Sequence, residues 1–255
     1  MYGLELRLRR LFPPDGRRLF AVPLDHSVSL GPIDGLESSA ATVEELQAGG
    51  ADLVIVTKGA VREVVPVLAP PTLLGIHLSA STALGPTPDH KVVVGTAAEA
   101  AALGADLVSV QVNFGAPDEP AMLAGLGSIS DQCRSAGLPL LCMAYVKRPT
   151  PATPEEIRHA CRAAADLGAD IVKTSYPGSP EAFRRIVEST PVPVLLGGGA
   201  RFDDPNVALE LIRTTIEQGG AGICIGRNLF QQRPLLPFAR RVAELVHGGP
   251  RRDAP

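Results

Sequence analysis

Lysine is scarce in this sequence. Of the 24 basic residues only four are lysines, namely Lys58, Lys91, Lys147 and Lys173, so arginine occupies most positions that carry a solvated positive charge. Lys173 nevertheless follows Ile171 and Val172, in a stretch that reads as a buried strand. Arginine cannot supply a neutral nucleophile, whereas a partly desolvated lysine can. A lysine kept inside such a strand therefore indicates that this position needs an amine.

Cysteine pairs and long apolar runs are also missing. The four cysteines show no C-x-x-C spacing, which argues against a disulfide framework and a structural zinc site and favours buried, reduced thiols. No apolar run approaches the roughly 18 residues that span a bilayer, and residues 1–10 alternate leucine with arginine instead of forming a secretory core. The net charge of −3 gives no electrostatic reason to bind nucleic acid or an anionic membrane. We expect a cytoplasmic globular enzyme.

A short phrase recurs along the chain: a helix end, glycine, alanine, usually aspartate, and then an apolar strand. The copies occupy residues 49–56, 103–110, 167–174 and 219–226. The glycine of each copy suits a left-handed helix C-cap, which lets the chain turn tightly into the strand. Successive copies lie roughly 50 to 65 residues apart, which leaves room for two βα units of about 30 residues each.

Four more apolar segments lie between these copies, at residues 19–24, 73–78, 138–145 and 192–196. Thr153 and Ser179, each followed by proline, read as N-caps of the intervening helices. Eight short apolar strands that alternate with helices favour an α/β fold, a closed (β/α)8 TIM barrel, over an open doubly wound sheet. We expect one barrel domain over residues 1–247. Within it residues 1–18 form a solvated leading segment without chemistry, placed to close the barrel floor, and residues 248–255 form a disordered tail.

Active sites of such barrels lie at the carboxyl ends of the strands, so the polar residues there are the candidates. Asp25 and His26 follow the first strand; each suits acid/base chemistry, and each equally suits a structural hydrogen bond. Lys58 follows the second strand, either as a solvated residue or as a second positive charge in the pocket. Tyr145 ends the fifth strand, as a catalytic hydroxyl or an aromatic plug. Residues 85–90 read as a loop over the mouth.

Lys173 lies on the sixth strand. Side chains alternate along a strand, so if Lys173 points into the barrel then Ile171 and Ser175 do too, while Val172 and Thr174 face the helices. Ser175 is therefore a candidate substrate-binding residue, together with His26 and Lys58. The alternative for Lys173 is a structural ion pair within the barrel.

Glycines follow the last two strands. Gly197-Gly198-Gly199 follows the seventh strand and Gly226-Arg227 follows the eighth. Backbone N–H groups of glycine can approach an anion closely, and the loops after strands 7 and 8 are a recurring phosphate site in barrels. These residues predict a phosphate cradle. A metal site is poorly supported, because only His26 and His77 of the five histidines lie at strand ends, so we expect no metal ligands.

A buried lysine suits Schiff-base chemistry. An unperturbed lysine is almost fully protonated near neutrality, and we expect burial to lower the pKa of Lys173. The neutral amine would attack a ketone and form an iminium, which stabilises a carbanion at the neighbouring carbon. A proton donor and a base are needed nearby, and Tyr145 and Asp25 suit these roles.

Five motifs together resemble the archaeal-type class I aldolases, in the same order over about residues 17–245. They are Asp25-His26-Ser27-Val28-Ser29-Leu30-Gly31-Pro32, Tyr145 after the fifth strand, Val172-Lys173-Thr174, Leu196-Gly197-Gly198-Gly199 and Ile225-Gly226-Arg227-Asn228. The family includes fructose-bisphosphate aldolases and synthases of 2-amino-3,7-dideoxy-D-threo-hept-6-ulosonate, which serve an alternative aromatic pathway. Two departures, Ser27 and Val146-Lys147-Arg148-Pro149, lie around the expected aldehyde pocket.

The resemblance implies a role for each matching residue. Lys173 would form the Schiff base without any further cofactor, Tyr145 would be the general acid/base and Asp25 a second catalytic carboxylate. The phosphate of a ketose phosphate or dihydroxyacetone phosphate would be held by Gly198, Gly199, Gly226 and Arg227. The resemblance also implies a homo-oligomer. The alanine-, arginine- and proline-rich composition is typical of a high-GC source, and relatives from such sources make aminohydroxybenzoate-type precursors from aspartate semialdehyde and dihydroxyacetone phosphate. The resemblance therefore implies aspartate semialdehyde as a candidate acceptor, in aromatic-precursor or secondary metabolism.

The leading hypothesis is therefore a metal-independent, lysine-dependent aldolase or transaldolase that acts on a phosphorylated ketone and an aldehyde. One alternative is an acyl-transferring thiolase of the same fold, which acyl transfer to coenzyme A would reveal. The other is a non-catalytic phosphosugar-binding protein, in which Lys173 pairs with the ligand and forms no adduct.

Overall fold

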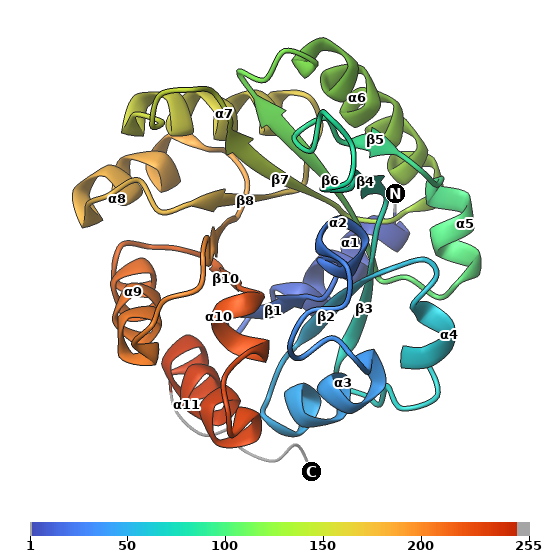
Figure 1. Cartoon of the computed structure of the whole chain (residues 1–255), viewed down its shortest axis with the longest axis vertical. Helices are drawn as coiled ribbons and strands as arrows, with labels where there is room; N and C mark the ends of the chain where they lie inside the picture. The colour runs from blue at the N-terminus through green and yellow to red at the C-terminus, as the bar shows by residue number, and fades with distance from the viewer. Residues whose placement is uncertain (1, 249–255) are drawn as a thin grey trace.

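Eight parallel strands close into a barrel, as the sequence predicts. The computed structural model describes residues 2–248, and the strand order around the barrel is β1-β10-β9-β8-β7-β6-β3-β2 (Figure 1). The strands are β1 (Leu19–Pro23), β2 (Leu53–Thr57), β3 (Leu73–His77), β6 (Leu107–Phe114), β7 (Leu140–Val146), β8 (Ile171–Ser175), β9 (Val194–Gly197) and β10 (Gly222–Cys224). Strand β1 pairs with both β10 and β2, so the barrel has no open edge.

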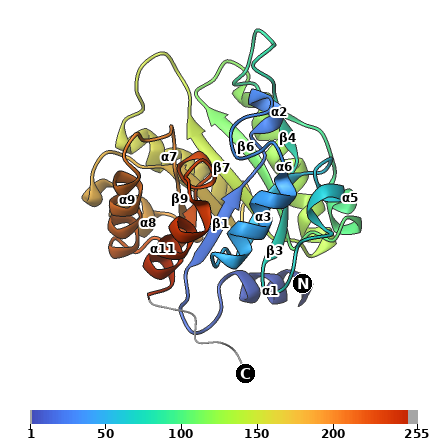
Figure 2. The ribbon, with the colours of Figure 1, turned by 60° about the horizontal axis from the view of Figure 1, so that its bottom comes forward.

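Helices surround the barrel, except for α1 and α2, which lie over its two ends (Figures 1 and 2). They are α1 (Tyr2–Leu11), α2 (Ser27–Leu30), α3 (Ser39–Ala48), α4 (Val61–Val64), α5 (Ala97–Ala102), α6 (Glu119–Ala136), α7 (Pro154–Asp166), α8 (Pro180–Ser189), α9 (Pro205–Glu217), α10 (Arg227–Phe230) and α11 (Leu235–His247). Both predicted N-caps are confirmed: Thr153 accepts from the backbone N–H of Glu156, and Ser179 from that of Ala182. Within residues 2–248, no helix combines the length and hydrophobicity that a bilayer crossing requires.

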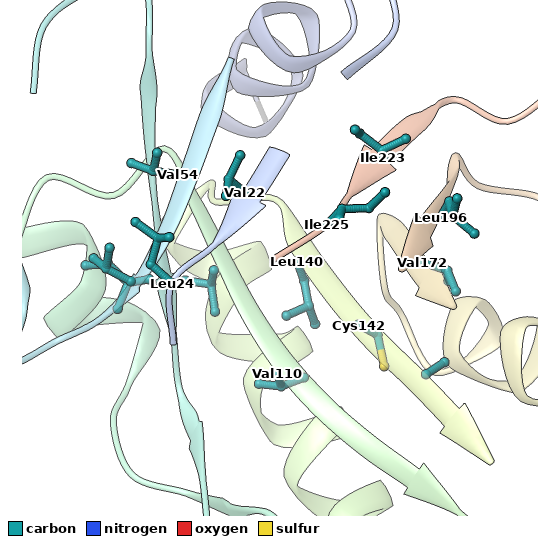
Figure 3. Close-up of a cluster of buried hydrophobic side chains, with 14 of the residues drawn as sticks. Val22, Leu24, Val54, Val110, Leu140, Cys142, Val172, Leu196, Ile223 and Ile225 are labelled. Atoms are coloured by element: carbon teal, nitrogen blue, oxygen red, sulfur yellow. The ribbon is translucent and has the colours of Figure 1, made fainter. Parts of the chain in front are cut away.

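Two apolar layers follow from the alternation of side chains along the strands. Val172 belongs to the outer layer between the sheet and the helices (Figure 3). Ile171 belongs to a second cluster inside the barrel, together with Met143 of β7 and Cys224 of β10. This alternation directs Lys173, two residues after Ile171, into the barrel.

The repeated aspartate of the Gly-Ala-Asp phrase joins neighbouring strands. Each copy accepts a hydrogen bond from a backbone N–H of the adjacent strand: Asp52 from Phe20 (2.9 Å), Asp106 from Leu74 (3.2 Å) and Asp170 from Leu140 (2.9 Å). The fourth copy has Gly222 instead, at φ +141°, where a Cβ would overlap the backbone of Leu19. In three copies of the repeat, the aspartate carboxylate thus accepts a hydrogen bond from a backbone N–H near the start of the neighbouring strand. In the fourth copy, glycine lets the two backbones lie in close contact.

The leading segment is more than a solvated arm. Residues 2–11 form α1 at the amino-terminal end of the barrel (Figure 2), and Leu11 is buried in the interior cluster, with Leu8 and Phe12 packed against it. These side chains fill the barrel floor, so a ligand reaches the interior only from the opposite end. Of the predicted tail, Gly248 is the left-handed C-cap of α11, and residues 249–255 lie outside the described part of the chain.

A small hairpin covers part of the mouth. Strands β4 (Ser79–Ala80) and β5 (Val92–Val93) pair antiparallel outside the barrel, between β3 and β6 in the chain. The predicted mouth loop, residues 85–90, joins them. Because the backbone N–H of Gln111 on β6 donates to Ser79 Oγ (3.0 Å), the hairpin is fixed to the barrel rim.

Candidate active site

A cavity of about 620 Å³ opens at the carboxyl ends of the strands. Of the ten residues given a catalytic, phosphate-binding or substrate-binding role from the sequence, all but Lys58 line it. They are Asp25, His26, Tyr145, Lys173, Ser175, Gly198, Gly199, Gly226 and Arg227. The barrel therefore brings together side chains from β1, β7 and β8 and backbone from the loops after β9 and β10.

Lys173 is buried in the base of this cavity, with 5% of its surface exposed. Its Nζ donates to Met143 Sδ at 3.8 Å and lies 5.9 Å from the centre of the Tyr145 ring. Among residues 2–248, no carboxylate lies within ion-pair distance of Nζ, so the structural ion pair considered for this lysine does not form. The amine faces the cavity.

Gly197, at the end of β9, brings Lys173 and Tyr145 together. A Cβ at this position would lie 3.1 Å from Lys173 Cε and 3.2 Å from Tyr145 Oη. The lysine stem and the phenol oxygen therefore converge on Gly197, and a larger residue there would force them to shift. Burial raises the pKa of Tyr145 and the charge of Lys173 partly opposes this, so the hydroxyl keeps its proton at neutral pH and can donate it.

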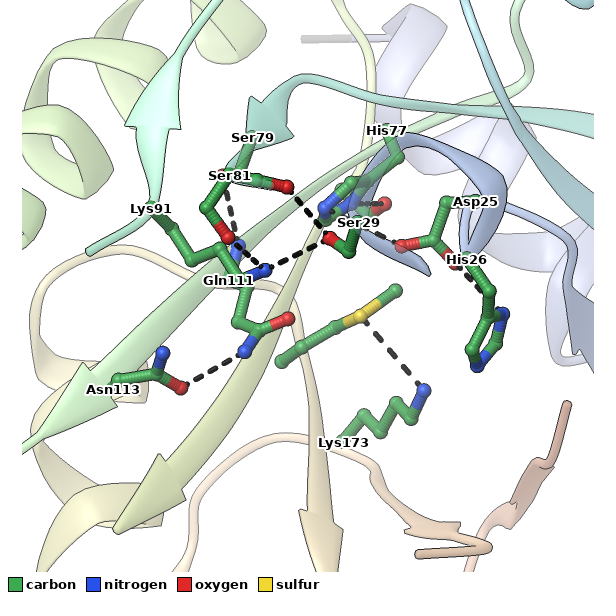
Figure 4. A network of polar contacts seen from close by, with 12 residues as sticks. Asp25, His26, Ser29, His77, Ser79, Ser81, Lys91, Gln111, Asn113 and Lys173 are labelled. Atoms are coloured by element: carbon green, nitrogen blue, oxygen red, sulfur yellow. Dashed lines mark hydrogen bonds and ion pairs between the residues drawn. The ribbon is translucent and has the colours of Figure 1, made fainter. Parts of the chain in front are cut away.

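Asp25 faces two histidines across the cavity. Its Oδ2 lies 3.6 Å from His77 Nε2 and its Oδ1 lies 3.8 Å from His26 Nδ1 (Figure 4). Burial alone would raise the pKa of Asp25, but His77, His26 and Lys173 lower it, and the net pKa lies below its ordinary value. Asp25 is thus an ionised carboxylate, able to accept a proton.

The two histidines carry no charge at neutral pH. Burial lowers the pKa of His26 to about 4, with Asp25 opposing the shift. Burial likewise lowers the pKa of His77, whose Nδ1 lies 2.8 Å from Ser109 Oγ. The positive charge of the site therefore comes from lysine and arginine.

The pKa of Lys173 differs from the sequence prediction. Burial lowers it, as expected, but Cys224, Tyr145 and Asp25 raise it by more, and the net pKa lies above its ordinary value. The amine is therefore protonated at neutral pH, and Asp25 is the ionised group of the cavity that stabilises its charge. A proton must leave Lys173 before the nitrogen can attack a ketone.

Lys58 does not belong to the cavity, which corrects its proposed substrate-binding role. It follows β2 as predicted, but its side chain is 41% exposed and its Nζ lies 3.1 Å from Glu99 Oε1. The second lysine of the cavity is instead Lys91, which the sequence did not single out. Lys91 lies beside β5, where its Nζ donates to Ser81 Oγ (2.6 Å) and to Ser29 Oγ (3.1 Å).

The glycines after β9 and β10 are joined by Asn228, which is 1% exposed. Its Nδ2 donates to the carbonyl oxygens of Gly198 (2.8 Å) and Ala200 (2.7 Å), and its Oδ1 accepts from the backbone N–H of Phe202 (2.7 Å). The amide thus fixes one glycine loop against the other.

Arg227 completes this cradle. Its guanidinium donates to the Gly199 carbonyl oxygen at 3.1 Å, while its Nε is buried with no hydrogen-bond partner among the described residues. A buried charged donor without a partner is costly, and an anionic ligand would remove that cost. The cradle is therefore suited to an anion.

We expect Asn228→Ala to lower the free energy of unfolding by about 2–4 kcal/mol, because three backbone groups would lose their hydrogen bonds to this buried amide. The same change should weaken binding of a phosphorylated ligand, since both glycine loops would be released. Urea unfolding and ligand titration would measure the two effects. Asn206→Ala is the matched control: this asparagine is exposed, and among residues 2–248 its side chain bonds Asp204 alone, so a loss below about 0.5 kcal/mol is expected. Equal losses in both variants would contradict the bridging role.

The described part of the chain contains no candidate metal site. Over residues 2–248, no group of three or more histidine, cysteine, aspartate and glutamate side chains gathers closely enough to hold an ion.

Comparison with known proteins identifies relatives over nearly the whole chain. The model of the DeoC/LacD family aldolases matches residues 19–232. A 2-amino-4,5-dihydroxy-6-oxo-7-(phosphonooxy)heptanoate synthase of Streptomyces griseus is 38% identical over 99% of this chain and 93% of its own. A 2-amino-3,7-dideoxy-D-threo-hept-6-ulosonate synthase of Halobacterium salinarum is 36% identical over 96% of this chain and 92% of its own.

Solved structures agree with this relationship. An archaeal fructose 1,6-bisphosphate aldolase superposes with a TM-score of 0.85 at 28% identity, over 96% of this chain and 100% of its own. An archaeal fructose-1,6-bisphosphate aldolase with its catalytic lysine covalently bound to the carbinolamine intermediate also gives a TM-score of 0.85, at 27% identity, over 96% and 100% of the two chains.

Proposed function

This chain belongs to the DeoC/LacD aldolase family, and we propose that it is a class I aldolase whose Lys173 forms a Schiff base with a phosphorylated ketone. The observation that carries the residue assignment is the position of Lys173. Its amine is buried, free of any carboxylate ion pair among residues 2–248, and directed into a cavity that also contains Tyr145 and Asp25. A lysine kept only for structure would be expected to have a charged partner.

The first step needs a neutral amine. We propose that Asp25 takes up the proton of Lys173 when the ketone binds, since Asp25 is the carboxylate that shifts the lysine pKa. The nitrogen then adds to the carbonyl carbon. Tyr145 donates a proton to the carbinolamine hydroxyl, which leaves as water and gives the iminium.

Carbon–carbon bond formation follows from the iminium. The Tyr145 phenolate left by the previous step takes a proton from the adjacent carbon, whose electron pair moves toward nitrogen and gives an enamine. The enamine carbon bonds to the aldehyde carbon, and Tyr145 returns the proton to the aldehyde oxygen. Water then hydrolyses the new iminium, which releases the product and restores Lys173. Cleavage is the same sequence in reverse.

The substrates are proposed from the cradle and from the relatives. Gly198, Gly199, Gly226 and Arg227 would bind the phosphate of dihydroxyacetone phosphate, with Ser175 and His26 beside it. The product named for the Streptomyces relative carries a phosphate at one end and an amino acid at the other end of a seven-carbon chain. A three-carbon ketone phosphate and a four-carbon amino aldehyde add up to that chain, which makes aspartate semialdehyde our proposed acceptor.

Trapping tests the proposal directly. With dihydroxyacetone phosphate and borohydride, we expect irreversible loss of activity and a reduced adduct that peptide mass mapping places on Lys173. Addition of EDTA should leave turnover unchanged. The absence of an adduct with any phosphorylated ketone would favour the phosphosugar-binding alternative, and acyl transfer to coenzyme A would favour the thiolase.

A further inference from the structure

We propose that Lys91 is the anion-binding residue for the second substrate, and that it makes the enzyme prefer aldehydes that carry a carboxylate. The inference rests on the proposed aldol reaction and adds to it a residue that selects the acceptor. It comes from the position of Lys91, from its contacts and from the neighbouring charges.

Lys91 lies across the barrel from the phosphate cradle. The cradle follows β9 and β10, whereas the hairpin that carries Lys91 is inserted between β3 and β6. In the strand order, the β9–β10 pair and the β6–β3 pair are diametrically opposite. Lys173 and Tyr145 lie on one arc between them and Asp25 on the other. The reacting groups therefore stand between two cationic ends of one cavity.

The ammonium group of Lys91 is held by neutral partners. Its Nζ donates to the hydroxyl oxygens of Ser81 and Ser29, and no carboxylate of residues 2–248 lies within ion-pair distance of it. Ser29 in turn donates to the Ser81 carbonyl oxygen (2.9 Å) and Ser81 to that of Pro88 (2.6 Å), which orients both hydroxyls. An ammonium group has three donors, and these contacts use two, so one N–H remains for a ligand.

Partial burial of the Lys91 ammonium group favours binding of an anion. Burial lowers the pKa of Lys91, although Asp25 and Asp89 oppose the shift, so the ammonium group has lost part of its hydration. A ligand carboxylate would replace that hydration by a charge-assisted hydrogen bond. Figure 4 shows the Lys91 amine beside Ser81 and Ser29, at one side of the group of polar residues, and the Lys173 amine nearer to Asp25 and His26.

The neighbouring rim lysine provides a contrast. Lys147 also lines the cavity, but its side chain is 49% exposed and its Nζ lies 3.7 Å from Asp89 Oδ1. That charge is already compensated and hydrated. Lys147 should therefore contribute little to anion selection, which makes it a matched control for Lys91.

The experiment compares two four-carbon aldehydes, 4-oxobutanoate and butanal, with dihydroxyacetone phosphate as the donor. The measured quantity is the ratio of their kcat/KM values. In Lys91→Gln we expect this ratio to fall about tenfold or more, mainly through KM for 4-oxobutanoate, as loss of a buried charge contact implies. Lys91→Arg should retain most of the preference, and Lys147→Gln should change the ratio less than about threefold.

Trapping with the donor alone separates the possible failures. A borohydride adduct on Lys173 in Lys91→Gln would show that this variant folds and activates the ketone. Suppose that adduct forms but the ratio stays unchanged, either because neither kcat/KM changes or because both fall by the same factor. The role proposed for Lys91 is then wrong, while the aldolase proposal stands. If the wild-type enzyme forms no adduct, the aldolase proposal itself is wrong.

Discussion

Replacing Lys173 by arginine should reduce turnover to background, a loss of more than about 10⁴-fold given the usual acceleration by enzymes. Arginine keeps the positive charge and much of the length of the side chain, but its guanidinium stays protonated and cannot attack a carbonyl carbon. Steady-state kinetics should therefore show no turnover, and borohydride trapping should give no adduct. The phosphate cradle lies on other elements, so Lys173→Arg should still bind dihydroxyacetone phosphate.

The matched control is Lys58→Arg. Lys58 also follows a barrel strand, but it is exposed and paired with Glu99 outside the cavity. We expect this variant to keep turnover within about twofold, because surface ion pairs contribute little. Turnover that survives in Lys173→Arg would remove the covalent mechanism, and equal losses in both variants would point to a general effect of lysine replacement.

Replacing Asp25 by asparagine should lower kcat by about 10²–10⁴-fold, the usual contribution of a positioned acid or base. The same change should make adduct formation less dependent on high pH. Asp25 is one of the groups that raise the pKa of Lys173, so its removal lowers that pKa. The neutral fraction of the amine then grows at a given pH, and the rising limb of the profile moves to lower pH.

The rate of borohydride inactivation with dihydroxyacetone phosphate should be measured between roughly pH 6 and 9. This range lies below the usual lysine pKa and covers the rising limb. In the wild-type enzyme the rate should rise with pH over the whole range, because the raised lysine pKa lies above it. Asp89→Asn is the control, since this carboxylate lies at the rim beside Lys147. If Asp25→Asn and Asp89→Asn gave the same profile as the wild type, the coupling between Asp25 and Lys173 would be refuted.

The barrel could be predicted because its signals are local. The Gly-Ala-Asp phrase marks every second strand, and apolar segments between the copies supply the rest. The function of the repeated aspartate was not predictable in the same way. Asp52, Asp106 and Asp170 bond strands some 30 residues earlier in the chain, a relation that appears only once the strands are paired.

The candidate site was predictable where a side chain follows a barrel strand without interruption. Asp25, Tyr145 and Lys173 are of this kind, since strand alternation and the barrel rule together direct them to the mouth. The same rule failed for Lys58, because the chain turns outward after β2 and Glu99 of α5 attracts the side chain. It also missed Lys91, which reaches the cavity through a hairpin of two-residue strands too short to give a pattern.

Asn228 was visible in the Ile225-Gly226-Arg227-Asn228 motif, but its role was not. Its three partners lie 26 to 30 residues earlier in the chain, so no spacing within the motif reveals them. The sign of the lysine pKa shift was missed for a related reason. Burial can be inferred from a strand pattern, whereas the opposing Asp25, Tyr145 and Cys224 come from three other strands or loops.

The side chains that close the barrel floor bear on the order in which the two substrates bind. Leu8, Leu11 and Phe12 close the amino-terminal end of the barrel, so in the described part of the chain both reactants and the product pass through the mouth. The aldehyde bonds to the enamine that the ketone forms on Lys173, so the ketone has to react first. We therefore expect compulsory-order kinetics, in which the phosphorylated ketone binds before the aldehyde.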